Sequence, residues 1–155
     1  MNNQQVGRIV NFFRINHHFH DPYQLLLDGN FIKIMVERGI DLKHKLENVT
    51  NGRVSLRVTS CILRELELLG MDFKLVLEEA RKHKTIFCKH PLEYSVDSCI
   101  VDQIGESNEK MFMVCSQDLE LRRHLRTLEH VPIIYFGPDQ RVTMEDIPKY
   151  SLKVI

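Results

Sequence analysis

Three cysteines and a histidine in this sequence could together bind a metal ion. Cys88, His90 and Cys99 fall within the stretch FCKHPLEYSVDSC, and Cys61 lies earlier in the chain. Structural zinc ions take four nitrogen or sulfur ligands at the corners of a tetrahedron. Free cysteines are also among the most buried residues of proteins, and His90 could simply cap a turn. The spacing is not that of a standard zinc finger, and the residues by themselves therefore leave both interpretations open.

Four acidic residues follow expected strands or begin expected helices, and they form a second group that could do chemistry. They are Asp28, Glu65, Asp97 and Asp118. In open α/β sheets, sites form outside the carboxyl ends of the strands, where such side chains can converge. Several carboxylates there would suit Mg²⁺ or Mn²⁺, ions that activate water and neutralise a phosphodiester. Acidic residues are equally favoured in the first turn of a helix by the helix dipole, which is the alternative interpretation of each one.

The segment DLELRRHLR contains the densest group of positive charges. Arg122, Arg123 and Arg126 fall within about one and a half turns of an expected helix. Guanidinium groups match phosphate oxygens, and phosphate contacts supply nucleic-acid affinity without reading the sequence. We expect an RNA-binding surface here. A solvated helix face, with Glu120 in ion-pair range, is the alternative.

Two further basic positions could contact RNA. Arg14 lies among aromatic and histidine residues near the N-terminus, a mixture that suits stacking on unpaired bases. Lys89 lies within the cysteine-rich stretch and would add positive charge beside the expected metal ion. In the alternative interpretation of the N-terminal segment, Phe12 and Phe13 pack on the sheet instead of contacting bases.

The composition limits the class of protein. The chain has 155 residues, of which 43% are hydrophobic and 27% charged, values typical of a single globular domain. Its formal net charge is zero, and nucleic-acid binding therefore requires a local patch. No apolar run approaches the roughly 18 residues that span a bilayer, and the N-terminus lacks a signal-peptide pattern. We expect no membrane partner and a cytosolic or nuclear compartment, where disulfides are rare.

The elements that must position these residues alternate along the chain. Apolar and alternating runs predict strands at residues 23–27, 54–59, 85–87, 110–115 and 132–136, with an edge strand at 141–144. Helical spacing and capping residues predict helices at residues 30–38, 41–49, 61–69, 73–83, 96–104 and from a cap at Ser116 to about 128. This alternation predicts an α/β domain with a central, mainly parallel sheet flanked by helices.

The domain organisation follows from one break near the N-terminus. We expect residues 1–20 to form an arm, extended or partly helical, and residues 21–155 to form the α/β domain. Asp21-Pro22 separates the two, because the residue before a proline avoids the helical conformation. Residues 88–99 would form an inserted metal-binding loop within the domain.

Several blocks of the sequence together resemble the PIN-domain family. They are, in chain order, LLLDGNF, CILRELELLG, the C-x-H loop with its later cysteine, VCSQDLELRRHLR and VPIIYF. The sequence is most similar to the branch of the U-three small nucleolar RNA-associated protein twenty-three of the small-subunit processome, from about Phe12 to about Met144. The resemblance implies a PIN-like fold with an inserted structural zinc site. That branch has Cys-Cys-His-Cys ligands, and the matching positions are Cys61, Cys88, His90 and Cys99.

The same resemblance implies a divalent-metal site at the four acidic residues, where active PIN nucleases bind Mg²⁺ or Mn²⁺. Active members have a further acid two residues before the position of Asp118, and this sequence has Ser116 there. A hydroxyl supplies no charge, whereas Mg²⁺ demands anionic oxygens in near-octahedral geometry. We therefore expect a vestigial acidic site without nuclease activity. The third acid of the family aligns with either Asp97 or Ser98.

The function implied by the resemblance is that of a nucleolar, RNA-binding ribosome-assembly factor in early small-subunit (18S) rRNA processing. The implied partners are pre-rRNA, an H/ACA small nucleolar RNA and other proteins of the small-subunit processome. Two alternatives come from other classes: an active Mg²⁺- or Mn²⁺-dependent endoribonuclease, and a protein-docking module without an RNA role. RNA cleavage would indicate the first alternative, and an absence of salt-dependent RNA binding would indicate the second.

Overall fold

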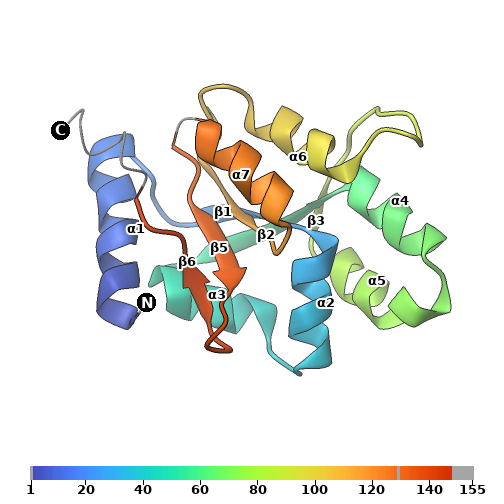
Figure 1. Ribbon diagram of the computed structural model, residues 1–155, viewed down its shortest axis with the longest axis horizontal. Coiled ribbons are helices and arrows are strands. Elements are labelled where there is room, and N and C mark those ends of the chain that lie inside the picture. Colours follow the sequence, from blue (N-terminus) through green and yellow to red (C-terminus); the bar gives the residue numbers. More distant parts are fainter. Residues whose placement is uncertain (1, 129, 148–155) are drawn as a thin grey trace.

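A six-stranded sheet forms the centre of the structure (Figure 1), a computed structural model that describes residues 2–128 and 130–147. The strands are β1 (Tyr23–Leu27), β2 (Val54–Thr59), β3 (Lys84–Ile86), β4 (Phe112–Cys115), β5 (Ile133–Phe136) and β6 (Val142–Met144). Their spatial order is β3-β2-β1-β4-β5-β6. β5 and β6 pair antiparallel, while the other neighbours pair parallel. The predicted α/β class with a mainly parallel sheet is confirmed.

Helices connect the parallel strands and cover both faces of the sheet. They are α1 (Asn3–His17), α2 (Gly29–Glu37), α3 (Leu42–Thr50), α4 (Ser60–Leu68), α5 (Lys74–Arg81), α6 (Val96–Ile104) and α7 (Leu119–Thr127), with a short 3-10 helix at Met71–Phe73. Figure 1 shows α6 and α7 on one side of the sheet and α2, α3 and α5 on the other. Parallel strands need such crossovers, and right-handed crossovers change face where the strand order reverses.

The strand order reverses at the centre of the sheet, between β1 and β4. From β1 the chain adds β2 and β3 on one side, and it then returns to add β4, β5 and β6 on the other. Leu27 and Cys115, the last residues of β1 and β4, lie opposite each other in register. The residues that follow them, Asp28 and Ser116, therefore meet at the carboxyl edge of the sheet, where open α/β folds place their sites.

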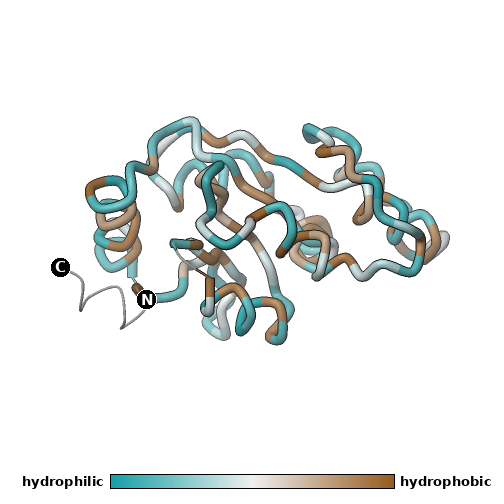
Figure 2. Tube along the Cα trace, turned by 90° about the horizontal axis from the view of Figure 1, so that it is seen from above, coloured by the Kyte–Doolittle hydropathy of each residue, from teal (hydrophilic) through white to brown (hydrophobic). Residues whose placement is uncertain are grey.

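The N-terminal segment is a helix that packs against the rest of the chain. α1 begins at a capping box formed by Asn2 and Gln5, and it buries Val6, Phe12 and Phe13. Figure 2 shows hydrophobic residues recurring along this helix between hydrophilic ones. The helix contacts α3 and β6. The segment is thus helical rather than extended. Of the two interpretations of Phe12 and Phe13, packing is the correct one, because both rings are buried in the apolar core.

Side-chain caps set three helix starts at the carboxyl edge of the sheet. Asp28, Thr59 and Asp118 each accept a hydrogen bond from the backbone N–H three residues later. Such caps satisfy one of the helical N–H groups that have no partner within the helix. The prediction that Ser116 caps the last helix is wrong, since Asp118 caps α7 and the hydroxyl of Ser116 donates to Asp28 instead.

The apolar core surrounds the central strands. Leu25, Leu26 and Leu27 of β1 are all fully buried, as expected for a parallel strand covered on both faces. Cys115 at the end of β4 is also fully buried, which confirms its predicted place in the core. Within the described residues, none of the helices has the length and apolar composition needed to cross a membrane.

Candidate metal centre and acidic pocket

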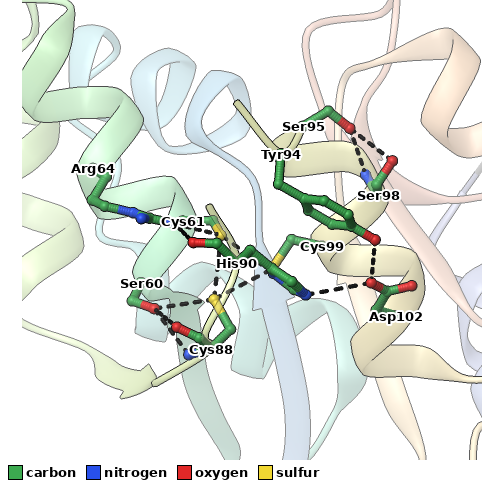
Figure 3. Close-up of polar contacts among 10 residues, drawn as sticks. All are labelled: Ser60, Cys61, Arg64, Cys88, His90, Tyr94, Ser95, Ser98, Cys99 and Asp102. Carbon is green, nitrogen blue, oxygen red and sulfur yellow. Dashed lines mark hydrogen bonds and ion pairs between the residues drawn. The ribbon is translucent and has the colours of Figure 1, made fainter. Parts of the chain in front are cut away.

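The four predicted zinc ligands converge on one point of the structure (Figure 3). The possible ligand atoms of Cys61, Cys88, His90 and Cys99 all lie within 4.8 Å of one another. Sγ of Cys61 is 3.3 Å from Sγ of Cys88 and 3.5 Å from Nδ1 of His90. Sγ of Cys99 is 3.6 Å from Sγ of Cys88. The structure therefore brings together residues that the sequence holds far apart.

These separations fit a tetrahedral zinc site. With Zn–S bonds of about 2.3 Å, sulfur atoms at tetrahedral corners would lie about 3.8 Å apart. Cys61 and Cys99 are buried, and Cys88 and His90 are half-buried. A set of four protein ligands with little exposure is typical of structural rather than catalytic sites. The cluster can therefore hold a metal ion, and three sulfurs with one imidazole nitrogen favour Zn²⁺ over Mg²⁺ or Ca²⁺.

Three segments of the chain supply these ligands. Cys61 is the second residue of α4, which follows β2 directly. Cys88 and His90 lie in the loop that follows β3, and Cys99 lies in the first turn of α6. β2 and β3 are hydrogen-bonded neighbours, and the residues that leave their carboxyl ends therefore emerge side by side. The order of parallel strands, rather than spacing along the sequence, closes the site.

The imidazole of His90 is held on the side away from the sulfur atoms. Nδ1 faces Cys61, while Nε2 lies 3.4 Å from a carboxylate oxygen of Asp102. The ring stacks on Tyr94 with centroids 4.1 Å apart, and the Tyr94 hydroxyl donates a hydrogen bond to Asp102. Metal-binding histidines commonly donate their second N–H to a carboxylate in this way. The sequence predictions omit Asp102 and Tyr94. The one signal is that Asp102 follows Cys99 by three residues, on the same helix face.

Two polar side chains of α4 contact the cluster. Ser60 Oγ lies 3.1 Å from Sγ of Cys88 and accepts a hydrogen bond from the backbone N–H of Cys88 at 3.0 Å. Nη2 of Arg64 donates to Sγ of Cys61 at 3.2 Å and to the backbone carbonyl of His90 at 3.0 Å. Donors of this kind offset negative charge on thiolates and orient the ligands.

The surroundings of the thiols favour one thiolate before any metal binds. Burial opposes ionisation of Cys88, but hydrogen bonds with Ser60 and Cys61 lower its pKa to about 6. Burial raises the pKa of Cys99 to about 12, and this thiol therefore stays protonated at neutral pH in the absence of metal. Because thiolates rather than thiols bind zinc, metal binding would release protons from the cluster.

A pocket of about 370 Å³ lies beside the cluster at the carboxyl edge of the sheet. All the predicted acidic residues line it: Asp28, Glu65, Asp97 and Asp118. Two of them follow β1 and β4, and the other two come from α4 and α6, the helices that also carry Cys61 and Cys99 of the cluster. The pocket and the metal cluster therefore share a wall. In the described part of the chain, the carboxylates are not gathered as closely as the sulfur and nitrogen ligands.

Ser116 does not line this pocket, but it contacts Asp28, which does. Its hydroxyl, fully buried, donates a hydrogen bond to one carboxylate oxygen of Asp28. The other oxygen of Asp28 accepts the backbone N–H of Phe31 at 2.7 Å. The Ser116 hydroxyl oxygen accepts the backbone N–H of Asp118 at 3.1 Å. Both oxygens of Asp28 are thus engaged within the protein, and Ser116 adds a neutral hydroxyl where an acid would add a charged ligand.

Two carboxyl groups of the pocket, those of Asp28 and Asp97, resist ionisation. Burial raises the pKa of Asp28 to about 6, although the hydrogen bond from Ser116 acts in the opposite direction. Burial, and then the neighbouring carboxyl groups of Asp118 and Glu65, raise the pKa of Asp97 above its usual value. Low hydration and like charges both disfavour the ionised form. A bound cation would relieve both effects.

Comparison with known proteins assigns this fold and pocket to a family. The family model described as Fcf1 matches residues 48–146. The chain belongs to the Fcf1 family. The matched segment contains the four zinc ligands predicted from the sequence and every acidic residue of the pocket except Asp28.

Individual relatives of this Fcf1-family chain agree with that assignment. The rRNA-processing protein FCF1 homolog of Mus musculus is 29% identical over 139 residues, which cover 88% of this chain and 68% of the mouse protein. The rRNA-processing protein utp23 of Schizosaccharomyces pombe is 30% identical over 131 residues. That match covers 83% of this chain and 50% of the yeast protein. The chain thus spans about two thirds of one relative and half of the other.

A solved structure described as the PIN domain endonuclease Utp24 has the same fold. It superposes with a TM-score of 0.75 and 25% sequence identity, and it covers 84% of this chain and 96% of the other. The predicted PIN-like fold and the resemblance to the PIN-domain branch that includes utp23 and FCF1 are therefore confirmed.

The basic residues predicted to contact RNA lie on three separate surfaces of this Fcf1-family structure. Arg14 is exposed on α1, and Lys89 is exposed in the loop between two zinc ligands. Arg123 is exposed on α7, where it pairs with Glu120 at 3.1 Å. These residues therefore do not form one continuous basic patch.

The remaining two arginines of α7 converge on one carboxylate. Nε of Arg122 lies 2.7 Å from Glu145, and the Arg122 guanidinium lies 3.9 Å from the ring centre of Tyr135. Nε and Nη2 of Arg126 lie 2.6 and 2.8 Å from the two oxygens of Glu145. Arg122 is only 9% exposed. Glu145, just after the edge strand β6, thus engages Arg122 and Arg126, although Arg126, like Arg123, is exposed. That α7 binds RNA stays a prediction.

Proposed function

We propose that this protein is an RNA-binding ribosome-assembly factor that acts in early small-subunit (18S) rRNA processing and lacks nuclease activity. Its membership of the Fcf1 family supports this, since the mouse and fission-yeast relatives are named rRNA-processing proteins. The proposed partners are pre-rRNA, an H/ACA small nucleolar RNA and other proteins of the small-subunit processome. The proposed compartment is the nucleolus, where these partners assemble.

The proposed lack of nuclease activity rests on the hydrogen bond between Ser116 and Asp28. In an active PIN nuclease, an acid at this position would supply a charged oxygen to a divalent cation. Here the hydroxyl is a donor, and it occupies an oxygen of Asp28 that a cation would need. Metal-assisted cleavage needs several anionic oxygens at fixed geometry, and each cation must be held by them.

The cysteine and histidine cluster has a structural role in this proposal. Zinc at Cys61, Cys88, His90 and Cys99 would tie the loop after β3 to α4 and α6, the helices that form one wall of the acidic pocket. The loop itself has little apolar packing to hold it, since Phe87 and Leu92 are 85% and 71% exposed. Metal binding would therefore contribute directly to the stability of this part of the fold.

Exposed cations away from the pocket are the proposed RNA contacts. Arg14 lines an open cavity of about 560 Å³ together with His18 and His20, and no carboxylate is among its lining residues. Lys89 and Arg123 add exposed charges on the zinc-binding loop and on α7. Contacts of this kind bind the phosphate backbone without reading bases. Arg122 is not proposed as a contact, because its side chain is buried.

An RNA-binding assay at several salt concentrations tests the binding part of the proposal. Single-stranded RNA should bind with an affinity that falls as salt rises, because phosphate contacts release counterions. Replacing Arg14, Lys89 and Arg123 together by alanine should weaken binding and reduce the slope of that dependence by about two, roughly 0.7 for each phosphate of a single strand that is no longer neutralised. Binding that is absent, or insensitive to salt, would favour the protein-docking alternative.

A cleavage assay tests the proposed lack of nuclease activity. The RNA should remain intact with the zinc-loaded protein in Mn²⁺, to the same extent as with the Asp28→Asn variant. If the wild-type protein cleaves the RNA and Asp28→Asn does not, the endoribonuclease alternative is established. The similarity to a structure described as an endonuclease is the reason to test it.

Depletion in cells tests the proposed process. Loss of the protein should cause unprocessed precursors of the small-subunit rRNA to accumulate while large-subunit rRNA is still made. Normal levels of mature 18S rRNA after depletion would contradict the proposed role. Fluorescence microscopy of the tagged protein tests the proposed nucleolar location separately.

A further inference from the structure

Arg64 connects the metal cluster to the acidic pocket. The side chain extends from α4 across the cluster (Figure 3), and the residue also lines the pocket that contains the four carboxylates. It is half-buried. Among the described residues that line this pocket, Arg64 is the basic one, and Glu65, Asp97 and Asp28 are among the acidic ones.

The guanidinium of Arg64 is held from one side. Nη2 makes both hydrogen bonds, one to Sγ of Cys61 and one to the carbonyl of His90. In the part of the chain that the structure describes, neither Nε nor Nη1 has a hydrogen bond and the side chain forms no ion pair with a carboxylate. An arginine beside several acids usually pairs with one of them. Its position here therefore leaves a fixed cation with two unused donor groups at the rim of the pocket.

We propose that Arg64 binds a phosphate group of RNA at the acidic pocket and that the zinc centre holds its guanidinium in place. This inference rests on the proposed RNA-binding function and adds a specific contact to it. A guanidinium is a permanent cation whose N–H groups donate hydrogen bonds to phosphate oxygens. Nη2 belongs to both paired donor edges and is tied to Cys61 and His90. Nε and Nη1, which point in different directions, therefore remain as single donors to a phosphate oxygen.

The zinc centre explains why an arginine can keep this position. Three thiolates around Zn²⁺ leave a net negative charge on the cluster, and a donor from Arg64 to Cys61 offsets part of it. The carbonyl of His90 supplies a second fixed acceptor. Loss of zinc would free the loop that bears His90, and Arg64 would then lose the carbonyl of His90, while Cys61 stays near it on α4. RNA binding at the pocket should therefore depend on zinc.

The carboxylates of the pocket oppose the same contact. A phosphate near Asp28, Glu65 and Asp97 meets like charges, and the single cation of Arg64 offsets them only in part. Added Mg²⁺ should therefore strengthen RNA binding at this pocket, since a divalent cation screens the acids. Contacts on the distant surface of Arg14 would not gain in the same way, because no acid lines that cavity.

Fluorescence anisotropy with a labelled single-stranded oligouridine tests the proposal. Arg64→Ala should weaken binding in Mg²⁺ by about 10- to 100-fold, the loss of a charge-assisted hydrogen-bonded pair. Arg64→Gln should weaken RNA binding by a similar factor, although it keeps an amide donor near Cys61. The zinc content of this variant should equal that of the wild type. Arg81→Ala removes the same charge from the exposed pair of Arg81 on α5 with Glu67 on α4 and should change affinity little.

Removing zinc tests the link between the two sites. Zinc-free wild-type protein should bind the oligouridine about as weakly as the zinc-loaded Arg64→Gln variant, and zinc removal from that variant should cause little further loss. If zinc removal lowers the RNA affinity of the wild type and of Arg64→Gln by the same factor, the zinc centre does not act through Arg64. If both Arg64 variants bind RNA as tightly as the wild type, the phosphate contact is wrong. The same holds if Arg81→Ala loses as much affinity as the Arg64 variants. Neither outcome would affect the proposed RNA-binding function. Failure of the wild-type protein to bind RNA would overturn the proposed function as well.

Discussion

The carboxylate of Asp102 and Nε2 of His90 lie 3.4 Å apart, on the side of the imidazole that faces away from Cys61. A proton on Nε2, donated to Asp102, leaves the lone pair of Nδ1 free for a metal ion. Tyr94 supports this arrangement from both directions, because its ring stacks on His90 and its hydroxyl donates to Asp102. The contact therefore selects the tautomer that can serve as the fourth ligand.

Replacement of Asp102 by alanine should weaken zinc binding by about 10- to 100-fold without abolishing it, the usual cost of losing a carboxylate that orients a histidine ligand. Competition with a chromophoric chelator measures the change. Asp72→Ala removes an acid from an exposed position that is not part of the cluster and serves as the control. An Asp102→Ala affinity equal to that of Asp72→Ala would rule out this role.

Cys88 and Cys115 should respond differently to substitution. Cys88→Ser should abolish stoichiometric zinc binding and lower the free energy of unfolding, by about 4 kcal/mol when free zinc is about a thousandfold above the dissociation constant. Cys115→Ala should retain zinc, because Cys115 lies buried at the end of β4, outside the cluster. Metal analysis and thermal melts with and without a chelator measure both effects. A chelator that leaves the wild-type melt unchanged would exclude a structural metal ion.

The pocket carboxylate Asp28 should make stability depend on pH. Burial raises its pKa to about 6 in the folded protein, against 3.8 in an exposed carboxyl. Between these values the folded state keeps a proton that the unfolded state has released. The contribution of Asp28 to stability is therefore greatest below pH 3.8 and falls as pH rises from there to about 6, by up to about 3 kcal/mol at 1.36 kcal/mol per pKa unit.

Asp28→Asn should remove this pH dependence, and its stability relative to wild type should rise between pH 4 and 7. Urea unfolding across that range measures the difference. Asp41→Asn replaces an equivalent capping acid at the exposed start of α3 and controls for the change of cap. If the free energy of unfolding of the wild type, relative to that of Asp28→Asn, increases with pH, the pKa of Asp28 is not raised in the folded protein.

Glu145 should stabilise the fold through its two arginine partners. Burial by itself would raise the pKa of Glu145, but the hydrogen bonds from Arg126 and Arg122 lower it below 4.5. Its contribution is therefore present above pH 4.5 and is lost as pH falls through the folded-state pKa. Glu145→Gln should cost about 1–3 kcal/mol at neutral pH, with a smaller difference in acid.

The exposed pair of Glu120 and Arg123 provides the matched control for that prediction. Both side chains are at least 70% exposed, and Glu120→Gln should change stability by less than about 1 kcal/mol. Urea unfolding at neutral pH compares the two variants. Equal effects of the two substitutions would mean that the contacts of Glu145 with α7 add nothing beyond an ordinary surface pair.

Ser116→Asp should increase the response of the protein to Mn²⁺. A carboxylate at this buried position beside Asp28 should lower the melting temperature of the zinc-loaded protein without Mn²⁺, because like charges are brought together out of water. Added Mn²⁺ should raise the melting temperature of Ser116→Asp again, and this increase should be larger than the one that Mn²⁺ causes in the wild type. Ser116→Ala controls for loss of the hydroxyl. An Mn²⁺ effect of the same size in all three proteins would show that the missing acid does not limit cation binding.

Local sequence patterns by themselves determined the elements and the class of the fold. The apolar run at 23–27, the alternating strand at 54–59 and the helix at 96–104 were all predictable, because strand and helix periodicity depend on residues within a few positions of each other. The residue types of the zinc ligands and of the acids were also apparent. Their convergence follows from a parallel sheet, which gathers the ends of its strands at one edge.

Only the tertiary structure decided which side chains meet across that edge and which are free. Glu145 reaches Arg122, and Ser116 reaches Asp28, from positions on other elements of the chain. The same holds for Asp102 beside His90. Sequence periodicity describes the face on which a residue lies but not its neighbour across strands or helices. That neighbour depends on strand order and packing, which join segments far apart in the chain.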